Sequence, residues 1–121
     1  QDGIPSTAIA DETGPARAAE ATYVLVGADS VLRDGSVVNK TGTLPLAQSA
    51  TERGTPVYVA CETLKFDARF DTASWPGAGI EGLFDVTSGR LVTTVVTERG
   101  TYTPDIIRTM LSQSRTPISR R

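Results

Sequence analysis

The chain has 121 residues, enough for one domain and most naturally for one layered α/β unit. Its content of 39% apolar and 21% charged residues is that of an ordinary soluble globular protein. The formal charge of −2 gives a nucleic-acid-binding surface little support, and no apolar run approaches the roughly 20 residues that cross a bilayer.

The chain contains a single cysteine, Cys61, and no histidine. One cysteine cannot form an internal disulfide, which fits a reducing cytoplasm. The lack of histidine removes the commonest general base and the commonest metal ligand. The chain begins with Gln1, shows no signal-peptide pattern and enters a predicted strand almost at once. This start indicates a fragment or a processed form, with an engineered truncation as the alternative.

The first half of the chain alternates predicted strands with predicted helices. The short apolar run 6–10 is typical of a strand, and a helix is predicted from Thr13, with Pro15 in its first turn. The continuous apolar run 23–27 is typical of a strand buried on both faces of a parallel sheet. Strands alternating with helices imply a parallel sheet with right-handed crossovers.

Apolar runs on both sides of Asp34-Gly35 predict a hairpin with a two-residue turn. A helix is predicted over residues 44–53, with Gly54 as its C-terminal cap. Residues 56–61 then form another apolar run, which predicts a second buried strand.

The second half of the chain is predicted to begin with a loop region, residues 62–82, which is rich in glycine. A helix is predicted over 87–99, although its β-branched residues suit a strand equally well. Thr103-Pro104 opens a last amphipathic helix that carries apolar residues on one face. The predicted domain covers residues 1–114, and residues 115–121 are predicted as a flexible tail. The face of the last helix is formed by Ile106, Ile107, Met110 and Leu111.

Asp29 lies just past the end of the predicted strand 23–27. In open α/β sheets, ligands bind outside the carboxyl ends of the strands. A carboxylate there can orient a sugar hydroxyl or transfer a proton, especially where partial burial raises its pKa. The alternative is that Asp29 only accepts hydrogen bonds from loop amides, as aspartate often does after a strand.

Asn39 and Lys40 stand just before the predicted helix start at Gly42-Thr43. Backbone N–H groups at a helix start favour an anion, Lys40 adds positive charge, and Asn39 adds directional donors and an acceptor. The spacing is not that of a Walker A loop. The alternative is an ordinary capped helix with Lys40 in solvent.

Four further residues are ambiguous on sequence alone. Cys61 follows an apolar strand and is more typical of a small buried hydrophobe than of a nucleophile. Glu62 and Lys65 form either the wall of a site or a surface ion pair worth under about 1 kcal/mol. Trp75 either anchors its loop or faces a partner.

Three separated segments occur in the chain, namely GADSVLRDGSVVNKTGT, PVYVACETLKFD and FDVTSGRLVTTVVTERGTYTP. Together they resemble the translation initiation factor 2B alpha/beta/delta family, which also contains ribose-1,5-bisphosphate isomerase and 5-methylthioribose-1-phosphate isomerase. The resemblance extends from Gly3 to about Leu111, and the opening GIPSTAIAD is similar to a strand of the family. It implies a Rossmann-like three-layer α/β domain with a mostly parallel sheet, which forms the C-terminal part of the family fold.

The resemblance also implies functional residues. The aspartate of the family's GAD motif is catalytic in its isomerases, and the Asn-Lys pair of the NKxGT motif holds substrate. These positions are Asp29, Asn39 and Lys40 here. The implied reaction converts an aldose 1-phosphate to a ketose phosphate, with Asp29 as the acid/base partner of a cysteine, and needs neither a metal nor a nicotinamide.

The resemblance has limits. Family members carry an N-terminal half that supplies the catalytic cysteine and phosphate-binding arginines, so we expect this chain to hold half an active site and to be inactive alone. Cys61 does not stand where the family keeps that cysteine. The ETLKF segment is more similar to ribose-1,5-bisphosphate isomerase and the initiation-factor alpha subunit than to the methylthioribose enzyme. Asp29 favours the isomerase, whereas TERGTYTP favours the regulatory subunits. The alternative function is therefore a regulatory or assembly subunit of a guanine-nucleotide exchange factor, without catalysis.

The expected partners follow from the same resemblance. They are a sugar phosphate and a second copy of the domain or a larger assembly, with initiation factor subunits under the regulatory alternative. Apolar residues near 92–96 and 106–111 are candidate surfaces, although core burial explains them equally well. We expect no nucleic acid or membrane partner, no cofactor, and a cytoplasmic location.

Overall fold

The computed structural model describes residues 7–9, 22–79 and 82–114. The strand expected near the start of the chain is present as β1 (Thr7–Ile9). The helix predicted from Thr13 and the tail predicted over 115–121 lie outside the described residues.

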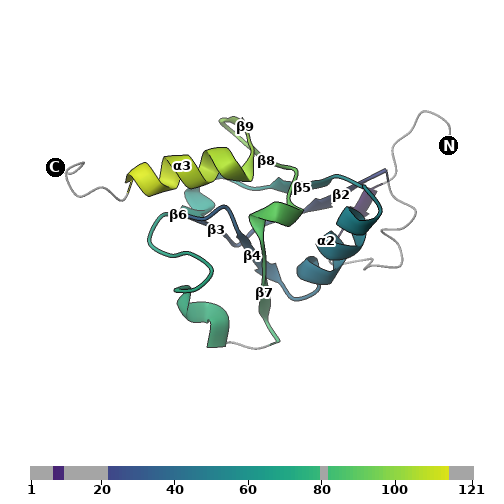
Figure 1. Ribbon diagram of the computed structural model, residues 1–121, viewed down its shortest axis with the longest axis horizontal. Coiled ribbons are helices and arrows are strands. Elements are labelled where there is room, and N and C mark those ends of the chain that lie inside the picture. The colour runs from purple at the N-terminus through teal and green to yellow at the C-terminus, as the bar shows by residue number, and fades with distance from the viewer. Residues whose placement is uncertain (1–6, 10–21, 80–81, 115–121) are drawn as a thin grey trace.

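The main sheet has five strands, and the first four along it run parallel (Figure 1). In spatial order they are β1, β2 (Tyr23–Val26), β5 (Val57–Ala60), β8 (Thr94–Thr97) and β9 (Gly100–Tyr102). Strand β9 turns back antiparallel to β8. The predicted fold class is therefore confirmed: the chain is mixed α/β with a mostly parallel, Rossmann-like sheet.

A second sheet is built on the predicted hairpin, and the sequence did not predict it as a sheet. Its spatial order is β6 (Phe66–Asp67), β3 (Ser30–Leu32), β4 (Val37–Lys40) and β7 (Phe84–Thr87). The region predicted as a loop thus supplies β6, together with two 3-10 turns, η1 (Thr63–Lys65) and η2 (Pro76–Gly79).

The hairpin between β3 and β4 is present, but its turn has three residues rather than two. The Leu32 N–H donates to the Ser36 carbonyl at 2.8 Å, and the Gly35 N–H donates to the Leu32 carbonyl at 2.9 Å. Gly35 has a φ of 85°. A turn that ends on a left-handed residue is a common three-residue hairpin loop, and glycine adopts that conformation without steric cost.

Helix α2 (Thr43–Glu52) confirms the helix predicted over 44–53. Its C-terminus is capped by two backbone bonds, from the Gly54 N–H to the Thr51 carbonyl at 3.0 Å and from the Thr55 N–H to the Ala50 carbonyl at 2.8 Å. This is the Schellman arrangement, and it requires a left-handed residue at Gly54, where φ is 75°. The prediction that Gly54 ends the helix is confirmed.

Helix α3 (Pro104–Ser114) confirms the last predicted helix. The Thr103 hydroxyl accepts a hydrogen bond from the Ile106 N–H at 3.2 Å and so caps the first turn. Ile107 and Leu111 are buried, whereas Ile106 is 48% exposed. The predicted apolar face is therefore only partly buried in the core.

The helix predicted over 87–99 is wrong. That segment holds the end of β7, a short 3-10 turn η3 (Gly89–Leu91) and strand β8, which hydrogen-bonds to β5. The β-branched residues in TTVVT favour the strand, because their side chains pack well on a pleated sheet. Gly100 does not end a helix. It is the first residue of β9, which follows β8 after a two-residue turn.

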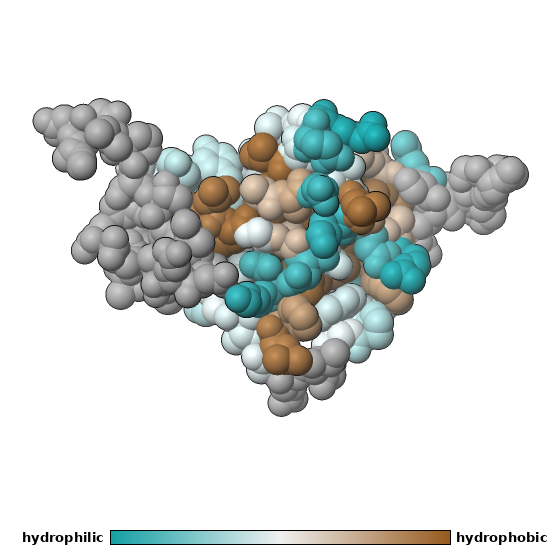
Figure 2. Space-filling view, turned by 180° about the vertical axis from the view of Figure 1, so that it is seen from behind, coloured by the Kyte–Doolittle hydropathy of each residue, from teal (hydrophilic) through white to brown (hydrophobic). Residues whose placement is uncertain are grey.

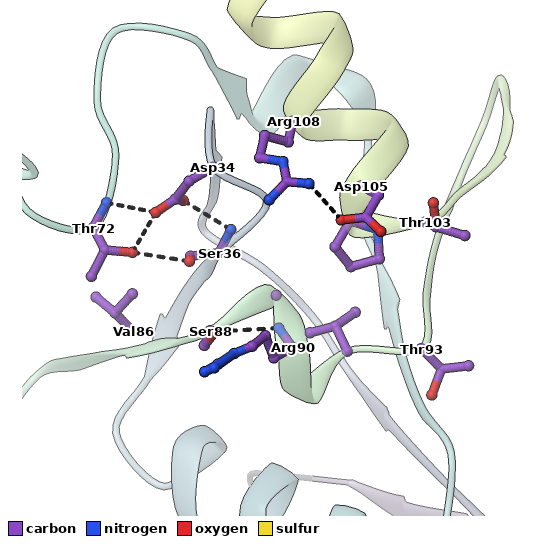
Figure 3. Close-up of a pocket in the computed structure, with 13 residues that line it drawn as sticks. Asp34, Ser36, Thr72, Val86, Ser88, Arg90, Thr93, Thr103, Asp105 and Arg108 are labelled. Atoms are coloured by element: carbon purple, nitrogen blue, oxygen red, sulfur yellow. Dashed lines mark hydrogen bonds and ion pairs between the residues drawn. The ribbon is translucent and has the colours of Figure 1, made fainter.

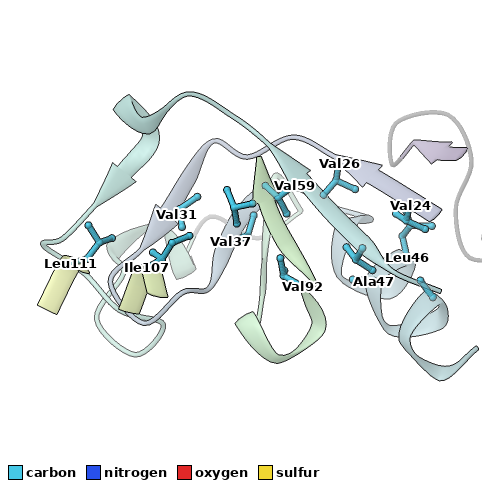
Figure 4. Packing of buried hydrophobic residues seen from close by; sticks show 13 residues of the cluster. Val24, Val26, Val31, Val37, Leu46, Ala47, Val59, Val92, Ile107 and Leu111 are labelled. Carbon is cyan, nitrogen blue, oxygen red and sulfur yellow. The ribbon is translucent and has the colours of Figure 1, made fainter. Parts of the chain in front are cut away.

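One apolar core joins the main sheet, the hairpin and both helices (Figure 4). Helices α2 and α3 lie toward opposite ends of the molecule (Figure 1). Among the described residues, no helix is long and apolar enough to cross a membrane. The fully buried side chains at the centre include Val24, Val31, Val37, Leu46, Val57, Val59, Val95 and Ile107.

Candidate functional site

Asp29 lies in the short connection between β2 and β3, beyond the carboxyl end of a central strand of the parallel sheet. Its backbone N–H donates to the Val38 carbonyl at 2.8 Å, so the start of β3 is tied to β4. The Asp29 residue itself is exposed rather than half-buried. Its carboxylate is therefore accessible to a ligand, as a proton-transfer role requires.

Asn39 and Lys40 are the last two residues of β4, next to the residue that Asp29 contacts. The Asn39 side-chain Nδ2 donates to the Thr43 Oγ1 at 3.1 Å, and that hydroxyl donates to the Lys40 carbonyl at 2.9 Å. Thr43 is buried. The structure thus brings Asp29, Asn39 and Lys40 to the same end of the hairpin, and a buried threonine hydroxyl fixes the amide.

Two backbone N–H groups at the start of α2, which were predicted to favour an anion, are already taken by a side chain of the protein. The Gly42 N–H and the Leu44 N–H both donate to Asp85 Oδ2, each at 3.0 Å. A carboxylate of the chain itself therefore occupies the positive end of the helix. Asp85 lies on β7, 41 residues after Leu44, so nothing in the local sequence of the helix start could have indicated this contact.

A groove of about 440 Å³ lies against Asp29 and includes Lys65. Lys65 comes from the 3-10 turn η1, which follows β5, the strand next to β2 in the sheet. Within the described residues no ion pair joins Lys65 to Glu62. Of the two interpretations given above, the wall of a site and a surface ion pair, the first describes Lys65 better. The groove is lined by Asp29, Ser30, Leu64, Lys65, Phe66, Asp67 and Arg69.

Cys61 lies at the same edge of the sheet and is half-buried. Burial, followed by the nearby carboxylates of Glu98 and Glu62, raises the pKa of its thiol to about 11 although Lys65 opposes the shift. A thiol with that pKa is almost wholly protonated at neutral pH and is a poor nucleophile. The structure thus agrees with the interpretation of Cys61 as a packed hydrophobe.

Glu98, in the turn between β8 and β9, ties two connections of this edge together. Its carboxylate accepts hydrogen bonds from the Thr63 N–H at 2.9 Å and from the Thr63 hydroxyl at 2.6 Å. These bonds lower the pKa of Glu98. Glu98 therefore acts as a brace for the η1 turn that carries Lys65.

Trp75 anchors its loop. Its ring lies edge-on to Phe84 with ring centroids 6.3 Å apart, and it also covers Gly77 so closely that no side chain fits there. The ring is half-buried, so the alternative in which Trp75 faces a partner stays a prediction.

A second cavity, of about 670 Å³, lies between the tip of the hairpin, η3 and the start of α3 (Figure 3). Asp34 there accepts hydrogen bonds from the Thr72 N–H, the Thr72 hydroxyl and the Ser36 N–H. Burial on its own raises the pKa of Asp34, but these bonds outweigh burial and lower it. The turn of the hairpin lines this cavity, whereas Asp29, Asn39 and Lys40 stand at the opposite end of the paired strands β3 and β4, so the cavity is not part of the site that contains them.

Among residues 7–9, 22–79 and 82–114, no group of three histidine, cysteine, aspartate or glutamate side chains is placed to hold a metal ion. The chemistry that this end of the hairpin offers is that of the accessible Asp29 carboxylate, in a groove that Lys65 and Arg69 also line, with Asn39 and Lys40 at the end of the adjoining strand. A carboxylate can move a proton, and lysine ammonium groups attract an anionic substrate.

Comparison with known proteins gives a consistent assignment. Residues 1–75 match the model of the initiation factor 2 subunit family. The chain is 37% identical to a ribose 1,5-bisphosphate isomerase from Haloferax volcanii, over 87% of this chain and 39% of that protein. It is 36% identical to a methylthioribose-1-phosphate isomerase from Syntrophotalea carbinolica, over 89% of this chain and 38% of that protein.

A solved structure agrees with these sequence relatives. The translation initiation factor eIF-2B of Pyrococcus horikoshii is 36% identical and superposes with a TM-score of 0.68, over 76% of this chain and 38% of that one. The chain thus spans about two fifths of the length of the isomerases that it matches. On these grounds the chain belongs to the initiation factor 2 subunit family.

Proposed function

We propose that this chain is the sugar-phosphate-binding part of an isomerase that converts ribose 1,5-bisphosphate, an aldose phosphate, to the corresponding ketose phosphate. The observation that carries the proposal is the grouping of Asp29, Asn39 and Lys40 at one end of the hairpin, with a groove beside Asp29 that Lys65 also lines. Similarity to named sugar-phosphate isomerases over most of the chain supports it.

The reaction is an internal redox exchange. In the substrate, C1 is at the aldehyde level and C2 carries a hydroxyl, whereas in the product C2 carries the ketone. Either a hydrogen with its electron pair moves from C2 to C1, or a proton leaves C2 and another is added to C1 through an enol whose C1 oxygen keeps its phosphate, so no external oxidant is required. The 2-hydroxyl loses its proton as the ketone forms, and the ring oxygen gains one as the ring opens.

In this proposal, Asp29 carries one of those protons. Asn39, held by Thr43, provides a fixed hydrogen-bonding group for a sugar oxygen. Lys40 and Lys65 attract the phosphate groups. Because the start of α2 is already neutralised by Asp85, the phosphate charge is met by side chains rather than by the helix.

The chain covers about two fifths of its isomerase relatives, so the remaining groups of the site are proposed to come from elsewhere in the full-length protein. We propose a cytoplasmic location and assembly into a dimer or larger complex. A second candidate function, a regulatory or assembly subunit of translation initiation factor 2B, is favoured by the similarity to the Pyrococcus horikoshii factor.

Two assays on the full-length protein separate these functions. The first assay measures turnover of ribose 1,5-bisphosphate and of 5-methylthioribose 1-phosphate. We expect the protein to turn over both or only the first, and to prefer ribose 1,5-bisphosphate. Co-purification with initiation factor 2 in the absence of turnover of either sugar phosphate would instead establish the regulatory function and contradict the proposal.

A further inference from the structure

Asp85 binds the segment that leads from β4 into α2. It lies on β7 directly opposite Asn39 in the β4–β7 pairing. Its Oδ2 atom accepts both the Gly42 N–H and the Leu44 N–H at 3.0 Å. A single carboxylate oxygen therefore holds the backbone on both sides of Thr43.

Thr43 carries this constraint to Asn39 and Lys40. Its Oγ1 accepts the Asn39 side-chain N–H at 3.1 Å and donates to the Lys40 carbonyl at 2.9 Å. Thr43 is only 1% exposed, so its hydroxyl has little freedom to find other partners. The position of Asn39 and the backbone at Lys40 thus depend on where Asp85 holds residues 42–44.

The helix start cannot be capped from within. The capping position is Gly42, which has no side chain and has a φ of 113°, and Pro45 has no N–H to donate. A cap must therefore come from another element, and Asp85 on β7 provides it.

The second oxygen of Asp85 argues against a purely structural cap. Oδ1 is buried and accepts no hydrogen bond within the described part of the chain. A buried carboxylate oxygen without a donor is unfavourable, and a shorter or uncharged cap would avoid that cost. Asp85 lies opposite Asn39 in the β4–β7 register, so this cost falls next to Asn39 and Lys40.

We infer that Asp85 is a positioning residue, which sets the placement of Asn39 and Lys40 for the substrate by holding residues 42–44. The inference rests on the proposed function where it gives Asn39 and Lys40 a substrate contact. The physical link from Asp85 through Thr43 does not depend on which sugar phosphate is bound.

The test compares substitutions at Asp85 in the full-length protein. Asp85→Ala removes both hydrogen bonds and is expected to raise KM for ribose 1,5-bisphosphate at least tenfold, with a smaller effect on kcat. In Asp85→Asn the amide oxygen can accept the same two N–H groups, so KM is expected to stay within about threefold of the wild-type value. An unchanged KM in Asp85→Ala, or an equal rise in Asp85→Asn, would overturn the inference.

Thr87→Val is the matched control. Thr87 lies two residues from Asp85 on the same strand, is buried, and has a hydroxyl without a partner within the described residues. Its replacement keeps the shape, breaks no hydrogen bond shown by the structure, and is expected to leave KM unchanged. A rise in KM in Thr87→Val equal to that in Asp85→Ala would indicate a general packing effect and contradict a specific role of Asp85.

Thr43 provides the second variant if Asp85→Ala does not fold. Thr43→Val breaks the hydrogen bonds to Asn39 and Lys40 and is expected to raise KM at least tenfold. Thr43→Ser retains the hydroxyl and is expected to keep KM near the wild-type value. Equal KM values for the two variants would overturn the inference.

If the wild-type protein turns over no sugar phosphate, the proposed function fails but the positioning link is still testable. The NMR signals of the Asn39 side-chain amide are then followed in wild type and Asp85→Asn against the variant that lacks the cap, Asp85→Ala or, should that not fold, Thr43→Val. A shift of those signals, with faster amide hydrogen exchange, is expected only in the variant without the cap. Unchanged signals there would overturn the inference.

Discussion

At the scale of single residues, Cys61 differs from a reactive cysteine in its surroundings rather than in its position. It lies at the carboxyl edge of the sheet, near Lys65, where ligands bind in open α/β sheets. Burial and two carboxylates nevertheless raise the pKa of its thiol to about 11. Since the thiolate is the reactive species, the environment suppresses its reactivity at neutral pH.

We therefore expect slow alkylation of Cys61 by iodoacetamide at pH 7.5, about 300-fold slower than in the unfolded chain, where a cysteine has a pKa of about 8.5. Because the folded pKa is raised, the rate should climb about tenfold per pH unit until it levels off near pH 11. The measurement is the alkylation rate of the Cys61 peptide by mass spectrometry, with urea-unfolded protein as the control. A plateau near pH 8.5 in the folded protein would contradict this account.

The site residues show what a sequence can reveal and what it cannot. The roles of Asp29, Asn39 and Lys40 rest on the family resemblance and stay a prediction. Their places, at a strand end and just before a helix start, were predicted because they reflect local structure that the sequence encodes directly. Asp85 was not, because its contact with Gly42 and Leu44 joins residues more than 40 positions apart. Contacts across a sheet depend on register, which short-range patterns do not specify.

At the scale of secondary-structure elements, Gly35 and Gly54 both have a positive φ but differ in what surrounds them. Gly54 ends α2 with a φ of 75° in open space, and Gly35 closes the β3–β4 turn with a φ of 85° against Pro104 at the start of α3. A Cβ atom at Gly35 would lie 2.8 Å from the Pro104 carbonyl oxygen. The hairpin turn therefore packs directly against the start of α3, whereas the end of α2 carries only a backbone requirement.

We expect Gly54→Ala to lower the free energy of unfolding by about 1 kcal/mol, the usual cost of a left-handed alanine. Gly35→Ala adds the clash with Pro104 and should cost roughly 2 kcal/mol or more. Gly27→Ala is the control, because its φ is not left-handed and the nearest atom would be 3.9 Å away, so it should change stability by less than about 0.5 kcal/mol. Urea unfolding measures all three, and equal effects of Gly35→Ala and Gly54→Ala would contradict the contact with α3.

Residues 87–99 were predicted as a helix, but they form the end of β7, the turn η3 and strand β8. The segment ends at a glycine, as helices often do, and that favoured a helix. Its β-branched residues decided otherwise because β8 lies between β5 and β9 and is paired on both sides. A glycine at the end of a segment is common both at helix ends and in hairpin turns. Here the pairing of β8 with its two neighbouring strands decided between them.

At the scale of the whole molecule, the apolar surface bears on assembly. Val96 is 40% exposed and Ile106 is 48% exposed, while their neighbours Val95 and Ile107 are fully buried. The face in Figure 2 shows apolar patches separated by a band of hydrophilic side chains. Core burial thus explains most of the apolar residues near 92–96 and 106–111, and the two exposed side chains remain candidates for an interface.

We expect the full-length protein to form a dimer or a larger assembly, and Ile106→Asp to shift it toward the monomer because a charge would be buried in the interface. Thr109→Asp, on an exposed position of the same helix, is the control and should leave the assembly unchanged. Sedimentation velocity across micromolar concentrations measures both. A monomer throughout, or equal effects of the two substitutions, would contradict assembly through Ile106.

The proton-transfer role of Asp29 is tested by the turnover of ribose 1,5-bisphosphate by the full-length protein with and without the Asp29 carboxylate. Asp29→Asn changes one exposed side chain and leaves the backbone bond to Val38 in place, so the fold should persist. We predict a loss of kcat of at least 100-fold with unchanged thermal stability, as expected when an acid/base group is removed. Turnover at the wild-type rate in a folded Asp29→Asn protein would contradict the proposal that Asp29 transfers a proton in the isomerisation.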